Sequence, residues 1–334
     1  MTGNPSVKAR IALWTTALGI VLLMVVVLGV LTGAAGGPLR IAGSWIETGS
    51  IDPMLKTIIL EIRLPRVLIA ALAGATLSLG GLVFQVLLRN PLAEPYILGV
   101  SGGGAVGAIT GILLGLSRFP GVSLTAFAGS TATLLVIVAI SSGRRIINKE
   151  SLLLSGVMVN AFCGAVILFL VSLVQDARLH TIMFWLMGDL SLAERGQTML
   201  LALVALPCFL LLWILSNKMN LLLMGEETAK SAGVPVRAVT LLLLGATSLM
   251  VSATVCQSGL IGFVGLVIPH VLRLSAGPDN RVLVPACVLG GGAYMVLCDV
   301  LARVLPEQGE LPVGVITALV GAPLFILLLR RSHK

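Results

Sequence analysis

Residues 217–237 read NKMNLLLMGEETAKSAGVPVR and lie between two long apolar segments, residues 197–216 and 237–256. A polar stretch between two segments of membrane-spanning length predicts a water-facing loop of a membrane protein. The composition agrees, because 57% of the chain is hydrophobic, 11% is charged and the mean hydropathy is +1.07. These values predict an all-α protein that crosses the membrane many times.

The loop carries signals for a short helix at about residues 226–232. Gly225 breaks the chain before it, Gly233 suits the position after it, and Pro235 prevents its continuation. Two carboxylates at its start suit the positive end of the helix dipole. The apolar run 221–224 is compatible with a second short helix. A helix that docks into a groove of a partner and a plain solvated surface helix fit this spacing equally well.

Ten segments are apolar enough and about long enough to cross some 30 Å of hydrocarbon. They are residues 11–32, 67–88, 95–116, 122–141, 152–175, 197–216, 237–256, 261–275, 283–300 and 313–329. The 261–275 segment is the weakest, because it is short and contains Pro269, and a broken helix is the alternative there. We therefore predict one transmembrane domain, residues 1–334, with about ten transmembrane helices.

The distribution of basic residues predicts which side of the membrane each loop faces. An even number of spans puts both termini on one side. If that side is the cytoplasm, 14 of the 22 Lys and Arg residues lie in cytoplasmic segments and 8 lie outside. Cytoplasmic loops of membrane proteins carry such an excess. We therefore expect cytoplasmic termini and a cytoplasmic 217–237 loop.

Two absences restrict how the protein obtains energy for transport. No charged residue lies near the middle of a predicted span, whereas ion-coupled carriers usually place ionisable groups there. The chain also lacks a G-x-x-x-x-G-K-[ST] phosphate-binding loop. We therefore expect no enzymatic activity in this chain and an energy input from another protein through a cytoplasmic surface. An ion-coupled secondary transporter and a structural or receptor-like membrane protein are the alternatives.

Other patterns predict structure rather than chemistry. The basic pI, about 9.7, reflects cytoplasmic loops and not a nucleic-acid partner. The three histidines lack metal-ligand spacing, so no metal site is expected. Phe184 and Trp185 suit the aromatic belt of a membrane interface. Glycines recur every four residues in the 95–116 span and predict a face for close helix packing; they are Gly103, Gly107, Gly111 and Gly115.

The loop and several other stretches resemble one protein family in their order and spacing. These stretches are residues 63–66 (RLPR), 89–105 (RNPLAEPYILGVSGGGA), 262–273 (GFVGLVIPHVLR) with 277–281 (GPDNR), 310–314 (ELPVG) and 321–323 (GAP). From about residue 60 to 331 the chain resembles the iron-siderophore, haem and vitamin B12 permeases of ABC importers. This is the FecCD-like, or type II importer, family.

The resemblance implies a permease with alternating access, working as a homodimer or with a close relative, with the substrate pathway at the dimer interface. Two ABC ATPase subunits would bind inside and hold ATP and Mg²⁺, so no cofactor is expected in this chain. A periplasmic or lipid-anchored binding protein would deliver a metal chelate: a ferric siderophore, haem or cobalamin. The expected location is the bacterial inner membrane.

The resemblance also implies roles for single residues. The ATPase-coupling element would consist of Gly225, Glu226, Glu227, Ala229, Lys230 and Gly233. The binding protein would dock on Arg63, Arg66 and Arg303, for which snorkelling or local pairing, for example with Glu61, is the alternative. The cytoplasmic gate and pathway would include Asn90, Pro91, Leu92 and Asn160, for which a tight turn and an interhelical hydrogen bond are the alternatives. For His270 we expect a structural hydrogen bond.

Overall fold

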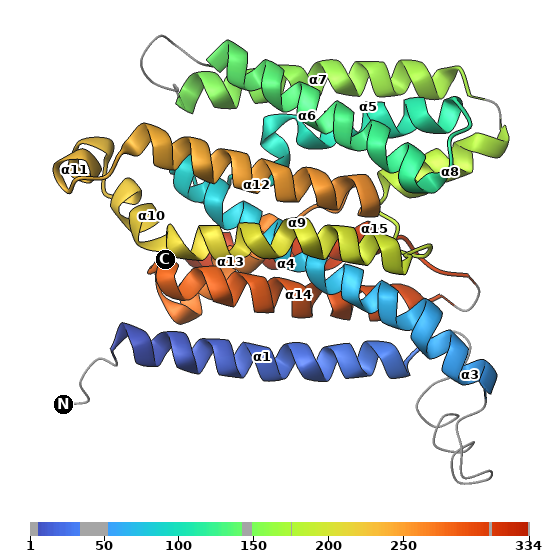
Figure 1. The fold of residues 1–334 in the computed structure, drawn as a ribbon, viewed down its shortest axis with the longest axis horizontal. Coiled ribbons are helices and arrows are strands. Elements are labelled where there is room, and N and C mark those ends of the chain that lie inside the picture. Colours follow the sequence, from blue (N-terminus) through green and yellow to red (C-terminus); the bar gives the residue numbers. More distant parts are fainter. Residues whose placement is uncertain (1–5, 34–52, 142–148, 175, 307–308, 333–334) are drawn as a thin grey trace, which may run out of the picture.

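The computed structural model describes residues 6–33, 53–141, 149–174, 176–306 and 309–332, and these residues form helices and no strand (Figure 1). Seven helical stretches are long and apolar enough to cross a membrane: Val7–Leu31 (α1), Pro53–Leu88, Arg118–Ser141, Glu150–Ser172, Arg195–Ile214 (α9), Val236–Ser258 (α12) and Asn280–Val304 (α14). Three shorter apolar helices are α5 (Val100–Leu113), α13 (Val264–Ala276) and α15 (Val313–Ser332). Each of the ten predicted segments falls on one of these stretches.

The second of these stretches is longer than predicted. Its helix begins at Pro53, because α3 (Pro53–Thr57) and the π-helical η1 (Ile58–Arg63) continue without a break into α4 (Leu64–Leu88). Hydropathy alone places the start at residue 67, where the apolar run begins. The polar residues before it stay helical because their side chains find partners on other helices, as described below.

Helix α4 forms the centre of the bundle, where it packs against α14, α13, α12 and α9. In the most apolar part of the Pro53–Leu88 stretch 83% of the residues are buried, against none in the corresponding part of α1 and 17% in that of Glu150–Ser172. Two glycines allow this close packing. A Cβ atom on Gly74 would overlap the backbone of Gly291 in α14, and one on Gly81 would overlap that of Gly265 in α13.

The predicted glycine face of α5 is confirmed for three of its four members. Gly103, Gly107 and Gly111 pack against α6 (Ser123–Ser141) and the turn before it, and a Cβ atom on Gly103 or Gly107 would overlap the α6 backbone. Gly115 differs, since it follows the end of α5 with a φ of +72° and nothing lies near its absent Cβ. It therefore turns the chain and does not pack a helix.

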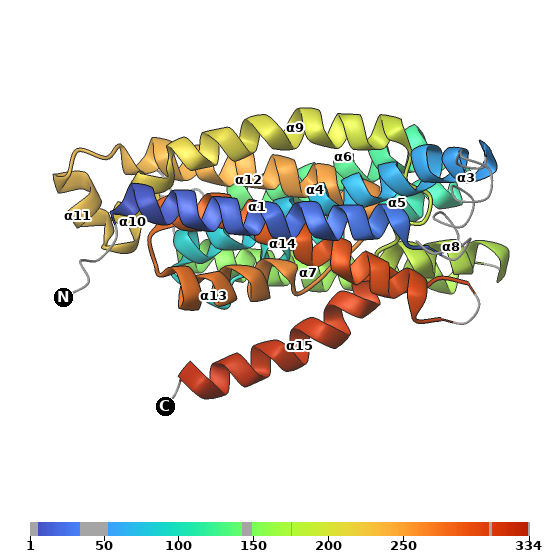
Figure 2. The same cartoon turned by 90° about the horizontal axis from the view of Figure 1, so that it is seen from below.

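The long helices run side by side along the longest axis, and the two ends of the bundle carry different short helices (Figures 1 and 2). One end carries the short helices α10 (Ser216–Leu223) and α11 (Glu226–Ser231), together with the start of α1 and the end of α15. We name it the α11 end. The other, the α8 end, carries α3 and α8 (Asp176–Leu186). Residues 1–5 and 333–334, for which a cytoplasmic location was predicted, lie outside the described residues.

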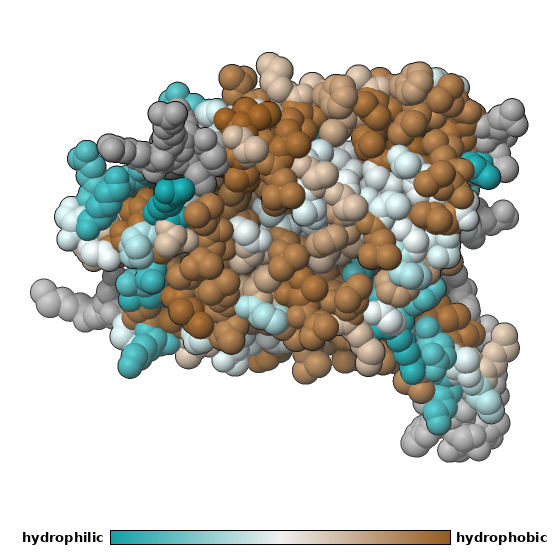
Figure 3. All heavy atoms as spheres, turned by 45° about the horizontal axis from the view of Figure 1, so that its top comes forward, coloured by the Kyte–Doolittle hydropathy of each residue, from teal (hydrophilic) through white to brown (hydrophobic). Residues whose placement is uncertain are grey.

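The surface follows the same division. In Figure 3 hydrophobic residues cover the middle of the face shown, and hydrophilic residues gather at both ends. Exposed large apolar side chains are numerous on α1 and on α7 (Lys149–Ser172), for example Leu23, Phe162 and Leu168. An apolar belt between two polar ends is the pattern of a protein that is solvated by lipid around its waist.

Candidate functional site

The predicted short helix of the 217–237 loop is present as α11, Glu226–Ser231. Gly225, directly before it, has φ 126° and ψ 151°, a region that is open almost only to glycine. At the other end the N–H of Gly233 donates to the carbonyl of Lys230, and the N–H of Val234 donates to that of Ala229, both at 2.9 Å. This pair of bonds, with Gly233 at φ 77°, is a Schellman motif that stops the helix.

Helix α11 has an inner and an outer face. Ala229 is fully buried and Val234 is buried beside it, which anchors the helix to the bundle. Glu227 and Lys230 are exposed, and Glu226 is half-buried. The six predicted coupling residues therefore belong to one short helix and the two glycines that flank it. The charged side chains of this helix project from the α11 end.

The second short helix of the loop, α10, begins at Ser216, ahead of the apolar run 221–224 that predicted it. Its first turn is polar and has no side-chain cap, so helix signals in the sequence do not mark its start. Two side chains of neighbouring helices hold it. The Nε of Arg89, at the C-terminus of α4, donates to the carbonyl of Leu222 at 3.1 Å, and Asp279 accepts from Asn220 at 2.8 Å.

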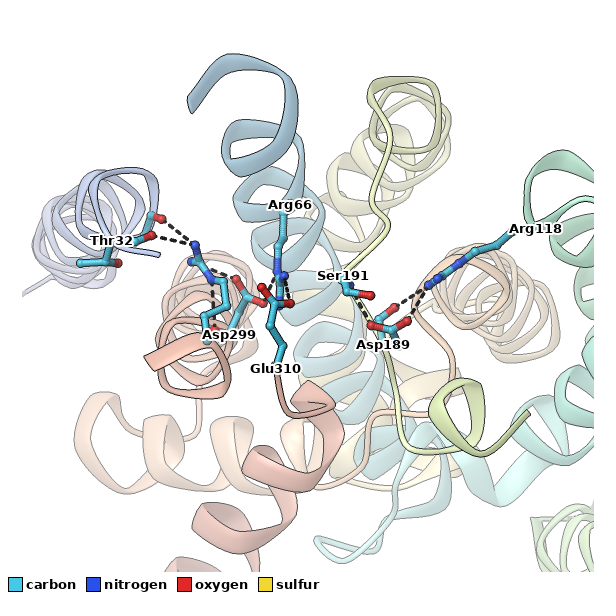
Figure 4. A network of polar contacts seen from close by, with 9 residues as sticks. Thr32, Arg66, Arg118, Asp189, Ser191, Asp299 and Glu310 are labelled. Atoms are coloured by element: carbon cyan, nitrogen blue, oxygen red, sulfur yellow. Dashed lines mark hydrogen bonds and ion pairs between the residues drawn. The ribbon is translucent and has the colours of Figure 1, made fainter. Parts of the chain in front are cut away.

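The three arginines predicted to dock a partner are enclosed in the bundle. Figure 4 shows Arg66 between Asp299 and Glu310. Arg63, Arg66 and Arg303 are each 4–5% exposed. Arg66 Nε donates to Asp299 Oδ1 at 2.8 Å, and its Nη1 pairs with Glu310. Arg303 Nη2 lies 3.0 Å from the second oxygen of Asp299.

Backbone carbonyls at the C-terminal end of α1 accept further hydrogen bonds from two of these arginines. Arg303 Nη1 donates to the carbonyls of Gly29 and Thr32, at 3.1 and 2.9 Å. Arg63 Nη1 donates to those of Val30 and Leu31 at 3.3 and 3.1 Å. The last carbonyls of a helix lack partners within the helix, and basic side chains supply them here. In this conformation the three arginines therefore face inward and close the α8 end.

Local pairing was the alternative for these arginines, and the structure shows it with other partners than the suggested Glu61. Glu61 instead accepts from Arg195 Nη2 at 2.7 Å, and both side chains are more than half exposed. Asp299 and Glu310 are the acidic residues that sequence reasoning missed. Asp299 sits at the end of an apolar span and Glu310 in a loop far along the chain, so no local pattern connects them with Arg66.

The predicted gate residues lie at the α11 end of α4. Asn90 Oδ1 accepts from the N–H of Leu92 at 2.9 Å, and the carbonyl of Asn90 accepts from Ala93 at 3.1 Å. These bonds form the tight turn that was the alternative interpretation. Pro91 and Leu92 are exposed at its tip, so the turn presents an apolar tip next to the end of the bundle.

Asn160 does not meet these three residues, but it contacts the segment that follows them. Its Nδ2 donates to the carbonyl of Tyr96 at 2.7 Å. Tyr96 belongs to η2 (Pro95–Leu98), a short 3-10 helix. The expected hydrogen bond of Asn160 is thus present, although its acceptor is a backbone group of η2 and not a long helix.

The η2 segment contacts residues 259–263, a segment without helical structure, inside the bundle. Tyr96 Oη donates to the carbonyl of Ile261 at 3.0 Å and accepts from its N–H at 2.9 Å. Glu94 Oε1 accepts from the N–H of Phe263 at 2.9 Å. Pro95 packs on Gly80. With a helical rise of 1.5 Å per residue, Gly80 lies about 12 Å before the C-terminal end of α4. Irregular backbone at such depth is tolerated where it is buried in protein or lines a water-filled path.

A cavity of about 440 Å³ lies at the α8 end beside α8. Apolar side chains line most of it, together with His180, Phe184 and Trp185. Its charged groups, Arg118 and Asp189, bind each other at 3.0 Å (Figure 4). Trp185 is buried, so the prediction that it faces the membrane interface was wrong for this residue.

Among the described residues no cluster of His, Cys, Asp and Glu is able to hold a metal ion. His180 stacks on Phe184 with ring centroids 4.4 Å apart. His270 packs edge-on against Phe325 of α15 at 5.7 Å, and its Nε2 has no hydrogen-bond partner in the described part of the chain. The hydrogen bond expected for His270 is therefore not made by Nε2, and the ring serves as a packing contact between α13 and α15.

The geometry defines a polytopic helical membrane protein with a charged short helix at one end. The model of the FecCD transport family matches residues 20–331, and the chain belongs to this family. It is a permease subunit of the ABC transporter class, a transport component and not an enzyme. The resemblance inferred from the sequence motifs is confirmed.

Two relatives show how much of the chain the similarity covers. The uncharacterized ABC transporter permease protein YvrB of Bacillus subtilis is 43% identical over 297 residues, which are 86% of this chain and 82% of that protein. The vitamin B12 import system permease protein BtuC of Citrobacter koseri is 38% identical over 321 residues, 96% of this chain and 95% of that one.

Solved structures agree with the fold. An inward-facing conformation of a putative metal-chelate type ABC transporter matches with a TM-score of 0.85 and 32% identity, over 95% of this chain and 98% of the other. PsaBC from Streptococcus pneumoniae matches with a TM-score of 0.57 at 17% identity, which supports the fold alone.

Proposed function

We propose that this chain is the membrane permease of an ATP-driven importer in the bacterial inner membrane. Its substrate would be a metal chelate, either cobalamin, a ferric siderophore or haem, and two permease copies would form the pathway by alternating access. The similarity to a vitamin B12 permease over almost the whole chain supports cobalamin as the first candidate. Both termini and the α11 end would face the cytoplasm.

One observation carries this proposal: the charged helix α11 stands at the end of an apolar bundle, with a defined stop at both termini. A helix held rigid on one face and charged on the other fits a groove in a partner. We propose that Gly225, Glu226, Glu227, Ala229, Lys230 and Gly233 form the contact with an ABC ATPase, which would bind ATP and Mg²⁺.

At the α8 end we propose docking of a periplasmic or lipid-anchored binding protein. Arg63, Arg66 and Arg303 would act from below the surface, because they are enclosed. They would fix the loop of Glu310, whose side chain is 33% exposed, in the shape that the binding protein meets. The turn of Asn90, Pro91 and Leu92, with Asn160 behind it, would form the cytoplasmic gate.

The test is reconstitution with the cognate ATPase and binding protein. We expect the three components to co-purify and to accumulate radiolabelled cyanocobalamin, a ferric siderophore or haem in proteoliposomes only when ATP is supplied. Replacement of both Glu226 and Glu227 by Lys should abolish ATPase binding or uncouple hydrolysis from uptake, while an Asn217→Ala variant on the exposed side of α10 should behave as wild type. Uptake that persists in vesicles without any ATPase would overturn the proposal in favour of a secondary transporter.

A further inference from the structure

The side chain of Asn220 bonds helix α10 to the start of α14, against which α10 also packs. Asn220 Nδ2 donates to Asp279 Oδ1 at 2.8 Å. Asn220 Oδ1 accepts twice from Asn280, from its backbone N–H at 2.9 Å and from its Nδ2 at 2.8 Å. One amide thus uses both its donor and its acceptor on two adjacent residues of another helix.

These two residues are also the ones that begin α14. Asp279 is its N-cap and accepts from the N–H of Arg281 at 3.0 Å. Asn280, the first helical residue, is fully buried, and its N–H has no acceptor within the helix. Asn220 supplies that acceptor. The first turn of α14 is therefore completed by α10, so α10 and α14 are bound to move together at this point.

The other end of α14 carries the second polar cluster of the molecule. The helix runs without interruption from Asn280 to Val304, and Asp299 and Arg303 near its end bind Arg66, Glu310 and the last carbonyls of α1. An α-helix of this length is about 37 Å long, and Pro285 removes one of its backbone hydrogen bonds near the start. Its two ends therefore lie in hydrogen-bonded clusters at both ends of the bundle, as do those of α4, where Arg66 binds Asp299 and Arg89 bonds to α10.

We infer that Asn220 is a positioning residue that locks the segment α10–α11, in which α11 contacts the ATPase, onto the start of α14, so that displacement of the segment by the ATPase moves α14. This inference rests on the proposed function. It adds a route: the segment acts on the bundle through α14, and a substitution at Asn220 breaks that route without touching the ATPase contact on α11.

Hydrogen exchange of the assembled complex tests the route directly. The complex with its ATPase is compared in the nucleotide-free state and in the state trapped with ATP and vanadate, for wild type, Asn220→Ala and the exposed neighbour Asn217→Ala. In wild type we expect slowed exchange in α10–α11 in the complex and a nucleotide-dependent change in residues 280–284. In Asn220→Ala the change at 280–284 should disappear, while protection of α10–α11 remains.

The Asn280 amide gives a second, independent readout. Loss of its acceptor in Asn220→Ala should speed its exchange about tenfold, the size expected for one lost hydrogen bond. If Asn220→Ala does not assemble, Asn220→Asp carries the same test. This variant still accepts from Asn280 but places a carboxylate against Asp279, so it should also lose the nucleotide-dependent change.

The outcomes separate the two hypotheses. A nucleotide-dependent change at 280–284 that survives in Asn220→Ala, or that is absent from wild type, overturns the route through α14. Absence of any protection of α10–α11 by the ATPase in wild type overturns the proposed coupling segment itself, and the route with it.

Discussion

Arg66 and Asp299 form the centre of the polar cluster at the α8 end, with Nε and Oδ1 2.8 Å apart and neither side chain accessible to solvent beyond 6%. The same carboxylate also faces Arg303 at 3.0 Å. One buried negative charge thus holds two guanidinium groups, and a second acid, Glu310, completes the pairing from a loop. This arrangement closes the end of the bundle where α1, α4 and α14 meet.

Replacement of Asp299 by Asn should be strongly destabilising, because it leaves two buried cations facing a neutral side chain. Breaking a buried pair by removing one partner costs about 3–5 kcal/mol. The measurement is thermal or denaturant unfolding of the purified protein in detergent. Arg195→Ala is the matched control, since its exposed pair with Glu61 contributes at most about 1 kcal/mol. Equal losses in the two variants would contradict the structural role of the buried cluster.

Tyr96→Phe should destabilise the junction between η2 and residues 259–263. The hydroxyl serves both the N–H and the carbonyl of Ile261, a residue that is 1% exposed. Unsatisfied buried polar groups cost about 1–3 kcal/mol. Tyr294→Phe is the control, because its hydroxyl reaches a backbone carbonyl, that of Thr317, only at a long 3.4 Å. Unfolding midpoints in the same detergent compare the two, and a larger loss in Tyr294→Phe would refute this account of Tyr96.

Gly225→Ala should weaken the coupling segment through the backbone alone. The φ of 126° strains any residue with a Cβ atom, at a cost of about 1–3 kcal/mol, although no backbone atom stands in the way of the added methyl group. We expect weaker co-purification of the ATPase with an otherwise intact bundle. Gly245→Ala in the middle of α12 is the control, since its Cβ would meet no other atom and helix geometry favours Ala. Reduced ATPase binding in Gly245→Ala alone would contradict the prediction.

The link between α10 and α14 should weaken in acid. Hydrogen bonds from Arg281 and Asn220 lower the pKa of Asp279 to about 2, below the ordinary value of about 3.9. A lowered carboxyl pKa adds stability above about pH 4, and this stability is lost as the pH falls toward 2. The melting temperature of wild type should therefore exceed that of Asp279→Asn at pH 6, and the difference should shrink below pH 4. A difference that stays constant from pH 6 to pH 2.5 would exclude this contribution of Asp279.

Most of the fold follows from hydropathy and from glycine and proline placement. All ten apolar segments are helices, and α11 begins and ends within a residue of the positions set by Gly225 and Gly233. Such features are local, so a single sequence contains them. The start of the second stretch was missed because its helix is maintained by contacts of Arg63 and Arg66 with distant groups, which override the local end of the apolar run.

The same difference between local and distant contacts applies to the predicted sites. The residues of α11 follow one another in the sequence, and so do those of the Asn90 turn, so a sequence motif is enough to predict the local geometry of each. The arginines at the α8 end were assigned to partner docking from the family resemblance. Their burial was not foreseen, because Asp299 and Glu310 lie far along the chain. Asn220 carries no sequence signal at all, since its importance comes from the start of a helix 60 residues away.

The central position of α4 has a consequence for how the chain is made. Arg66 is 233 residues ahead of Asp299 and 244 ahead of Glu310. During synthesis from the N-terminus, α4 enters the membrane with Arg66 unpaired and with Gly74 uncovered. Asp299 and Gly291, their partners, arrive only with α14, the ninth of the ten apolar stretches. A chain that ends after α13 therefore leaves Arg66 without Asp299 and Glu310, and the face of α4 around Gly74 without α14. Completion of the last fifth of the chain is what completes the packing of the central helix.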